Sequence, residues 1–261
     1  MQPKLSVITV NRNNAEGLKN TIISVVNQTF KNYEFIIIDG GSTDNSVDII
    51  KEYADKITYW VSEPDRGIFH GMNKGIARAQ GKYVIFMNSG DCFFSENTVA
   101  AVFAGNLAAD IIAGNAMMEA KRYRLKKRLP AKITFYYFFR RNSLCHQATF
   151  IKKTLFDEVG LYDETLRMQG DWKFFLLATA RYNKKIDTVN EYIALRQPDG
   201  ITDLKMWSEL RNREIYDTLM QHFPFFYDDY CRFHRLDKYS WRGLWRFVKR
   251  TVQSVMVRTL N

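Results

Sequence analysis

Cysteine is scarce in this sequence of 261 residues, and its three copies, Cys92, Cys145 and Cys231, lie far apart. They are too few for a disulfide framework, and no two have the C-x-x-C spacing of a structural zinc site. The N-terminus has no charged start followed by a long apolar stretch, so we expect no signal peptide. No apolar run approaches the roughly 20 residues that a membrane-spanning helix needs. These absences favour a protein of the cytoplasm.

Two nucleotide-binding motifs are also missing. A dinucleotide-binding protein would have G-x-G-x-x-G directly after its first strand, where this chain has NRNNAEG, residues 11–17. The segment GIARAQGKY, residues 75–83, resembles a phosphate-binding loop, but it has one residue too many between its glycines and a tyrosine in place of Ser or Thr. It also precedes a predicted strand when it should follow one. The sequence therefore disfavours a dehydrogenase, and the second match is accidental.

Short apolar runs alternate with amphipathic segments in the first ninety residues. The runs 5–10, 35–38, 57–61 and 83–87 have the apolar, β-branched composition of buried strands. Strands that alternate with helices predict a parallel, doubly wound sheet with helices on both faces. Further elements are expected in the second half: strands at 110–114, 148–151 and 186–195, a basic hairpin or loop at 122–130, a helix at 134–142, and a helix from Gly170.

Three aspartates follow the predicted strands of the first half. Asp39 ends the second strand, Asp65 follows the third, and Asp91 follows the fourth within the sequence NSGD. Ligands of doubly wound sheets bind beyond the carboxyl ends of the strands, so these three carboxylates are expected at one edge of one sheet. Taken alone, NSGD favours a simple turn, because Asn, Ser, Gly and Asp are the ordinary turn formers.

Several motifs, in this order, resemble family-two glycosyltransferases of the GT-A fold, and look closest to the inverting bacterial enzymes that build capsule and lipopolysaccharide sugars. The motifs are LSVITVNRNN, FIIIDGGSTDNS, SEPDRGIFHGMNKGIARAQGKYVIFMNSGD, CHQATF and GDWKFF. The resemblance runs from about Leu5 to about Leu195. It implies an α/β, GT-A-like fold: a doubly wound, mostly parallel sheet with helices on both faces in residues 1–200. A basic, aromatic-rich helical extension is expected in residues 201–261.

The implied activity moves a sugar from a nucleotide-diphosphate sugar, with UDP-sugar as the first choice, to a hydroxyl of a growing cell-surface glycan or lipid-linked acceptor. A divalent cation, Mg²⁺ or Mn²⁺, would resolve the repulsion between the diphosphate and the carboxylates. Asp91 is the carboxylate that remains of the family's acidic metal motif, so it is expected to bind the cation and the donor. Asn88 and Gly90 stand where the family has further acids, which predicts low metal affinity without donor.

The resemblance also implies the residues that bind the donor. Asp39 is expected to accept a hydrogen bond from a ring N–H of the base, which suits uracil or guanine better than adenine. Its alternative is a structural one, because GSTDNS would begin a helix without any ligand. The other implied donor-binding residues are Thr9, Val10, Asn11, Asn13, Asp65, Arg66 and Asn73. For Arg66, a solvated surface arginine is a nearly equal alternative.

Asp171, in the first turn of a predicted helix, matches the family's general base, which takes the proton of the acceptor hydroxyl. An acid at this place also interacts favourably with the helix dipole, so a structural role is the alternative. His146 and Gln147 are implied on the acceptor or diphosphate side, with a structural role for His146 at equal weight. Gly170 stands where the family often has an acid, a departure that bears on acceptor recognition. The implied reaction is a single in-line displacement with inversion.

The formal net charge of +10 is concentrated in the second half of the chain. One cluster is KRYRLKKR, residues 121–128, and the tail from Arg232 onward has eight Lys and Arg against the single acid Asp237. As a helix, this tail would gather Trp241, Trp245 and several aliphatic residues on one side, a pattern typical of peripheral contact with a membrane surface. Packing of the same helix on the catalytic domain is the equal alternative.

Two other classes of function compete with an active glycosyltransferase. A catalytically inactive sugar-nucleotide-binding protein is open because NSGD keeps one acid of the metal motif. A nucleic-acid-binding protein is disfavoured, since no recognition motif of that class is present and acids at the sheet edge would repel phosphates. The expected location is the cytoplasm, with the inner face of the membrane as an option. The sequence does not determine the sugar, the acceptor or the oligomeric state.

Overall fold

The computed structural model describes residues 2–105, 108–120, 123–139, 143–197 and 207–232. Its contacts divide the chain into two compact units, residues 1–212 and 213–261. The predicted boundary between residues 200 and 201 lies outside the described residues and stays a prediction. The predicted amphipathic helix after Arg232 also lies outside them. Within the described ranges, no helix combines the length and the apolar character that crossing a bilayer requires.

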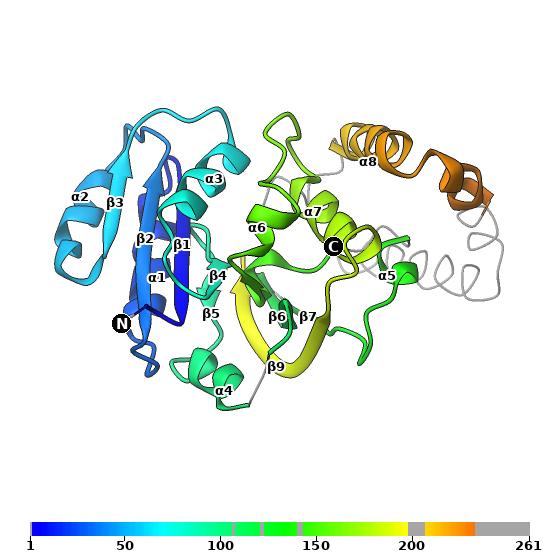
Figure 1. Cartoon of the computed structure of the whole chain (residues 1–261). Coiled ribbons are helices and arrows are strands. Elements are labelled where there is room, and N and C mark those ends of the chain that lie inside the picture. The colour runs from blue at the N-terminus through cyan, green and yellow to red at the C-terminus, as the bar shows by residue number, and fades with distance from the viewer. Residues whose placement is uncertain (1, 106–107, 121–122, 140–142, 198–206, 233–261) are drawn as a thin grey trace, which may run out of the picture. The chain divides into compact units, whose positions relative to one another are not determined.

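Nine strands of the described residues form a single sheet in the first unit (Figure 1). The strands are β1 (Leu5–Asn11), β2 (Tyr33–Asp39), β3 (Tyr59–Ser62), β4 (Tyr83–Phe86), β5 (Cys92–Phe93), β6 (Ile111–Ala120), β7 (Tyr123–Lys127), β8 (Thr149–Lys152) and β9 (Ile186–Arg196). Their order is β3-β2-β1-β4-β8-β6-β9-β5, with β7 paired to β6. The strands β3, β2, β1 and β4 are parallel, so their carboxyl ends meet at one edge.

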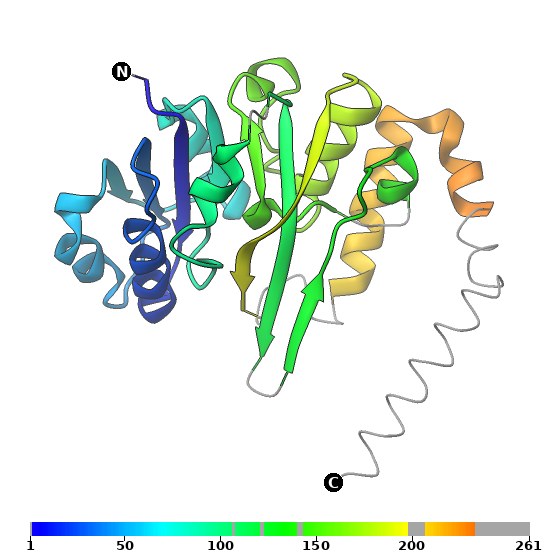
Figure 2. The ribbon, with the colours of Figure 1, turned by 90° about the horizontal axis from the view of Figure 1, so that it is seen from below.

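The second half of the sheet has mixed directions. β8 pairs antiparallel with both β4 and β6, whereas β9 runs parallel to β6, and these two long strands lie side by side in Figure 2. β7 forms an antiparallel hairpin with β6, so the basic segment expected as a hairpin or loop of its own at 122–130 contributes one strand of a hairpin whose other strand is β6. The two-residue strand β5 pairs with β9 and has no counterpart in the sequence prediction.

Helices cover both faces of the sheet. In the first unit they are α1 (Ala15–Val26), α2 (Ser46–Glu52), α3 (Ile68–Arg78), α4 (Thr98–Ala104), α5 (Phe135–Phe139), α6 (Leu155–Glu158) and α7 (Gly170–Ala180), with short 3-10 turns at η1 (Ala54–Lys56) and η2 (His146–Ala148). The structure also describes α8 (Ser208–His222), which begins in the first unit and continues into the second, and the 3-10 turn η5 (Pro224–Phe226) of the second unit. The fold class expected from the sequence is thereby confirmed.

Alternation along the strands explains the two layers, because successive side chains of a strand point to opposite faces. Val7 of β1 shares a core with Leu18 and Ile22 of α1. Its neighbour Ile8 faces the other way, and a Cβ placed on Gly75 of α3 would lie 2.4 Å from Ile8 Cγ2. Helix α3 therefore packs directly on the sheet, on the face opposite α1.

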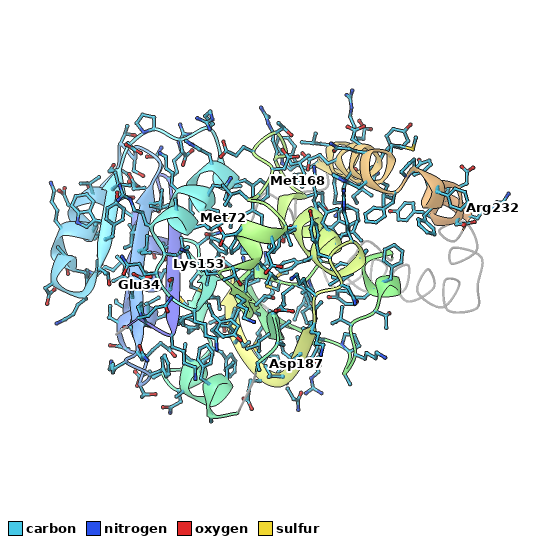
Figure 3. All side chains as sticks on the ribbon, in the orientation of Figure 1. Glu34, Met72, Lys153, Met168, Asp187 and Arg232 are labelled. Atoms are coloured by element: carbon cyan, nitrogen blue, oxygen red, sulfur yellow. The ribbon has the colours of Figure 1, made fainter. Side chains whose placement is uncertain are left out.

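Glu34, labelled in Figure 3, is a buried carboxylate at the other end of the parallel strands. Its Oε1 accepts hydrogen bonds from Ser6 Oγ at 2.6 Å and from the Gly81 N–H at 3.0 Å. These bonds tie together the starts of β1, β2 and β4. The role of Glu34 is therefore structural, in contrast to the acids at the carboxyl edge.

Candidate active site

Asp39, the last residue of β2, is fully buried among polar groups. Its Oδ1 accepts hydrogen bonds from Asn11 Nδ2 (2.7 Å) and Ser42 Oγ (2.6 Å), and its Oδ2 accepts from Ser62 Oγ (2.7 Å) and the Ser42 N–H (2.8 Å). Burial raises the pKa of Asp39, but the hydrogen bonds from Ser42, Ser62 and Asn11 outweigh burial and lower its pKa overall. The ionised carboxylate therefore has its acceptor positions occupied by the protein itself.

Asn11, at the end of β1, supplies an unpaired acceptor beside Asp39. Because a carboxylate only accepts hydrogen bonds, Asn11 must direct its amide NH₂ at Asp39, which fixes the orientation of the amide. Its Oδ1 is then left buried without a partner among the described residues. A buried acceptor without a partner costs about 1–3 kcal/mol, so an N–H or O–H of a ligand that reached Asn11 Oδ1 would be bound favourably.

The other residues expected around the nucleotide base differ in exposure. Thr9 and Val10 are buried, and Thr9 Oγ1 donates to the Met87 carbonyl at 2.7 Å. Asn13 is exposed, has a left-handed backbone with φ of 50°, and donates its N–H to Ser42 Oγ at 2.8 Å. Thr9 and Val10 thus form part of the sheet, whereas Asn13 joins the loop after β1 to the loop after β2.

Helix α1 holds the turn that contains Asp91. Thr21 Oγ1 lies 2.7 Å from the Asp91 carbonyl oxygen and accepts a hydrogen bond from the Gly90 N–H at 3.0 Å. Gly90 has φ of 97°, in the left-handed region that favours glycine. Asn14, at the start of α1, donates to the Ser89 carbonyl at 3.2 Å. These contacts reverse the chain after β4 and direct the Asp91 side chain inward.

The Asp91 carboxylate is 8% exposed, and its Oδ2 accepts a hydrogen bond from Gln147 Nε2 at 2.8 Å. Burial raises the pKa of Asp91, and the Gln147 hydrogen bond and the positive charge of Arg196 offset only part of that effect. Holding Asp91 ionised at neutral pH therefore costs folding free energy, and a nearby cation would reduce this cost.

Asp171 occupies the first turn of α7, as predicted. Its Oδ1 accepts a hydrogen bond from the Trp172 N–H at 2.7 Å, and its Oδ2 lies 3.4 Å from both His146 Nδ1 and Ser143 Oγ. The side chain is 17% exposed, so it is held on several sides while one part still reaches solvent. This is a suitable environment for a carboxylate that accepts a proton from a bound molecule.

The dipeptide His146–Gln147, in the turn η2, connects the two acids. Gln147 contacts Asp91, and His146 contacts Asp171. On its other side, His146 Nε2 lies 3.3 Å from Asn88 Nδ2 of the NSGD turn, and Asn88 Oδ1 is buried without a partner among the described residues. The structure thereby brings Asp91 and Asp171 into one hydrogen-bonded network, although they are far apart in the sequence.

Asp65 lies beside the Asp39 loop. A Cβ placed on Gly40 would be 2.4 Å from Asp65 Oδ2, and the same carboxylate accepts the Gly67 N–H through Oδ1 at 3.0 Å. Asp39 ends β2, and Asp65 and Asp91 follow β3 and β4. Because these strands are parallel, the three aspartates lie at the same edge of the sheet, as expected.

Arg66 and Asn73 share a partner, Glu164, that the sequence gave no reason to expect. The Arg66 guanidinium forms an ion pair with Glu164, and Asn73 Nδ2 donates to Glu164 Oε1 at 3.0 Å. Asn73 is buried and also bonds both backbone groups of Tyr162, at 2.9 and 3.1 Å. In this arrangement Asn73 anchors the segment 162–164 to α3, while Arg66 is mostly exposed.

Four further residues that contact the predicted site residues belong to no motif in the sequence. Ser62 ends β3 and Arg196 ends β9, so the rule that sites form at strand ends could have indicated both. Ser143 and Glu164 lie in irregular segments, and no pattern in the sequence distinguishes them. Their positions depend on how the second half of the sheet pairs.

The oxygen atoms near Asp91 fit a weakly held divalent cation. Asp91 contributes a carboxylate, and Asn88 contributes the unpaired amide oxygen described above. Among the described residues, no group of three or more His, Cys, Asp and Glu side chains could enclose a metal ion. Mg²⁺ is commonly bound by one or two carboxylates together with waters and substrate phosphates. The residues therefore fit a cation that arrives with a diphosphate, not a preformed cage.

Comparison with known proteins adds the family. The family model described as "Glycosyl transferase family 2" matches residues 6–156, more than half of the chain. The chain belongs to glycosyltransferase family 2. The matched range includes Asp39, Asp91 and the His146–Gln147 dipeptide, and it ends before Asp171.

Relatives of this glycosyltransferase include the PGL/p-HBAD biosynthesis glycosyltransferase of Mycobacterium bovis (strain BCG / Pasteur 1173P2). The two are 30% identical over 178 residues, which are 66% of this chain and 68% of the relative. An uncharacterized glycosyltransferase of Mycobacterium tuberculosis (strain CDC 1551 / Oshkosh) is 32% identical over 181 residues, 67% of this chain and 69% of that protein.

Solved structures share the fold of this family-2 glycosyltransferase. Staphylococcus aureus TarS 1–349 in complex with UDP-GlcNAc superposes with a TM-score of 0.61 at 18% identity, over 74% of this chain and 58% of that chain. The mannosyltransferase PcManGT from Pyrobaculum calidifontis, in complex with GDP-Man and Mn²⁺, gives 0.62 at 14% identity, over 85% and 64%. The chain thus spans less than two thirds of either structure's length.

Asp39 should make the stability of this glycosyltransferase depend on pH. A pKa lowered by folding stabilises the protein above the unfolded pKa of about 4, and that contribution is lost as the pH falls through the folded pKa. Asp39→Asn should lower the free energy of unfolding at pH 7 by about 1.5–3 kcal/mol, because hydrogen bonds to a charged acceptor are lost. Urea denaturation at several pH values should show the difference from wild type shrinking toward acid pH. A constant difference would contradict this role.

Proposed function

We propose that the protein is an inverting, cation-assisted glycosyltransferase that moves a sugar from a UDP-sugar to a hydroxyl of a cell-surface glycan or lipid-linked acceptor. The observation that carries the proposal is the network in which Gln147 binds Asp91 and the adjacent His146 contacts Asp171. This arrangement supports a pairing of one carboxylate that could hold a cation against the leaving diphosphate with a second carboxylate that could take the acceptor proton. The family membership supports the same reaction.

The donor-binding part of the proposal rests on the hydrogen-bonded cluster around Asp39. Asp39 is saturated by protein donors, so the acceptor offered to the nucleotide base is Asn11 Oδ1, which Asp39 orients. Uracil and guanine have a ring N–H that could donate to this oxygen, and adenine does not. The UDP and UDP-GlcNAc complexes of TarS favour uracil, while the GDP-Man complex of PcManGT keeps guanine as the alternative.

A divalent cation, when bound, would offset the negative charge that develops on the departing diphosphate. Asp91 and Asn88 are the residues that would hold it. Arg196 adds positive charge on the same side, since its charge lowers the pKa of Asp91 in part. The Mn²⁺ in the PcManGT complex supports a cation in this fold.

The remaining chemistry belongs to the acceptor side. The acceptor oxygen attacks the anomeric carbon as the bond from that carbon to the diphosphate oxygen breaks, and the acceptor proton passes to Asp171. The Trp172 N–H fixes Asp171 Oδ1, while His146 and Ser143 approach Oδ2, the oxygen nearer the rest of the network. One displacement from the face opposite the diphosphate inverts the anomeric carbon.

The acceptor class is inferred from weaker support. The mycobacterial relative is named for the biosynthesis of PGL and p-HBAD. The basic second half and the basic, aromatic tail after Arg232 suit an anionic or lipid-linked acceptor at a membrane surface. Capsule or lipopolysaccharide synthesis at the cytoplasmic face of the membrane would fit these properties.

A catalytically inactive sugar-nucleotide-binding protein is the second candidate. It is favoured by one observation: Asp91 is the one carboxylate of the NSGD turn, and burial raises its pKa. Such a protein would bind the donor without releasing nucleoside diphosphate. Release of UDP from a UDP-sugar, with water as the acceptor, distinguishes the two candidates.

A thermal-shift screen of nucleoside diphosphates tests the donor class. We expect UDP with Mn²⁺ to raise the unfolding midpoint, EDTA to reduce that rise, and ADP to give little change. Asn11→Ala should weaken UDP binding about tenfold, because a hydrogen bond of about 1–1.5 kcal/mol is lost. Asn45→Ala, at an exposed asparagine that caps α2 without a side-chain bond, is the control and should bind UDP normally. Equal shifts with all nucleotides, or none with any, would refute the proposed donor.

A further inference from the structure

The aromatic ring of Phe69 packs directly against the backbone of Gly170. A Cβ placed on Gly170 would lie 2.7 Å from Phe69 Cζ and 2.8 Å from both Phe69 Cε1 and Cε2. The edge of the Phe69 ring formed by Cζ, Cε1 and Cε2 therefore contacts Gly170, the first residue of α7. Gly170 and Phe69 are both buried, so the ring cannot turn out into solvent without losing its packing.

Phe69 connects two parts of the site. It is the second residue of α3, directly after the loop of Asp65 and Arg66 on the donor side. Its contact, Gly170, directly precedes Asp171 on the acceptor side.

An aromatic layer supports this contact. The Phe69 ring lies 5.7 Å from the ring of Tyr162, which in turn packs on Phe174 of α7 at 5.3 Å. Tyr162 Oη is buried without a hydrogen-bond partner among the described residues. Burial, with a contribution from the charge of Asp171, raises the pKa of Tyr162, which places this layer close to the carboxylate. The start of α7, which carries Asp171, is thus packed against a layer formed by Phe69, Tyr162 and Phe174.

We propose that Phe69 is a positioning residue for Asp171: its ring, seated on Gly170, fixes the first turn of α7 and so the place of the carboxylate relative to the donor. This inference rests on the proposed function. It also accounts for the glycine at position 170. Any side chain there would occupy the space that the Phe69 ring fills.

The test is a cycle of three variants: Gly170→Ala, Phe69→Leu and the double variant. The added methyl of Gly170→Ala must displace the ring and the turn, and a misplacement of about 1 Å costs on the order of 100-fold in rate. We expect kcat for UDP release from a UDP-sugar to fall by about that factor, with the dissociation constant of UDP unchanged. Phe69→Leu, which keeps an apolar side chain without the ring edge, should lose less.

The double variant tests whether the clash between the added methyl and the Phe69 ring causes the loss of rate. Leu at position 69 leaves room for the methyl but lacks the ring, so the double variant should recover from the rate of Gly170→Ala to the rate of Phe69→Leu. Gly81→Ala is the control for stability alone, because its Cβ would meet Ser6 N at 2.5 Å at the opposite end of the strands. It should lower the unfolding midpoint while its folded fraction keeps normal kcat.

Three outcomes overturn the inference: normal kcat in Gly170→Ala, normal kcat in Phe69→Leu, or a double variant no faster than Gly170→Ala. Failure of the proposed function would look different. If Asp171→Asn kept its activity, the base assignment would fail whatever the cycle showed, whereas an inactive Asp171→Asn beside a normal Gly170→Ala would refute the role of Phe69 alone.

Discussion

Replacing Asp171 by Asn should lower glycosyl transfer by about 10²–10⁴-fold, the usual contribution of a general base, and leave UDP binding unchanged. Asparagine keeps the size of the side chain and can still accept the Trp172 N–H, so the start of α7 should remain intact. What is lost is the capacity to take the acceptor proton. Single-turnover measurement of UDP release, with UDP affinity measured in parallel, separates chemistry from binding.

Asp163→Asn is a matched control for this experiment. Asp163 lies near the same helix and pairs with Lys173 at 2.7 Å, whereas His146 contacts Asp171 and Gln147 contacts Asp91. Hydrogen bonds from Lys173 and Thr165 lower the pKa of Asp163 despite the opposing effect of burial, so its neutralisation should cost stability. It should cost little transfer. If Asp171→Asn turned over near the wild-type rate, Asp171 would not be the base.

Asp91→Asn should separate stability from activity. Because burial raises the pKa of Asp91, its ionised form is costly in the unliganded protein, and the neutral amide should unfold at a midpoint no lower than the wild type. The same change removes the carboxylate that would hold the cation. We therefore expect transfer to fall by about 10²–10³-fold, as when a group that stabilises transition-state charge is lost, and Mn²⁺ to stop strengthening UDP binding.

Asp110→Asn supplies the contrast. The Lys185 N–H and Lys152 lower the pKa of Asp110 although burial opposes them, so its carboxylate stabilises the fold. This variant should unfold at a lower temperature and keep normal transfer. A less stable Asp91→Asn that transferred sugar at the wild-type rate would show that Asp91 is a structural acid, and would remove the main support for a bound cation.

The parallel half of the sheet could be predicted because its signals are local. β1, β2 and β4 are mostly apolar and are buried along nearly their whole length, which is typical of parallel strands. The second half was predicted less well, because its pairings join distant segments. β5 has two residues and is a strand only because β9 pairs with it, and β6 continues to Ala120, well past the predicted end, because both β7 and β9 pair along it.

In the site, too, some features could be predicted from local sequence and others depend on contacts between distant segments. Motifs at the ends of β2, β3 and β4 were enough to place Asp39, Asp65 and Asp91 at one edge, because parallel strands align their carboxyl ends. The functional roles of these residues, and those of His146, Gln147 and Asp171, stay predictions. No motif revealed that Asp39 is saturated, that Asn11 presents the unpaired acceptor, or that Glu164 pairs with Arg66, because each depends on side-chain directions in folded loops.

By itself, the order of residues determined the fold class and which polar side chains would follow the parallel strands, since local apolar patterns decide where strands begin and end. Only the tertiary structure decided that Gln147 meets Asp91, that His146 meets Asp171, and that Phe69 rests on Gly170. These contacts join segments whose separation along the chain has no periodic signature. Their geometry is set by packing of helices on a completed sheet, which no local pattern encodes.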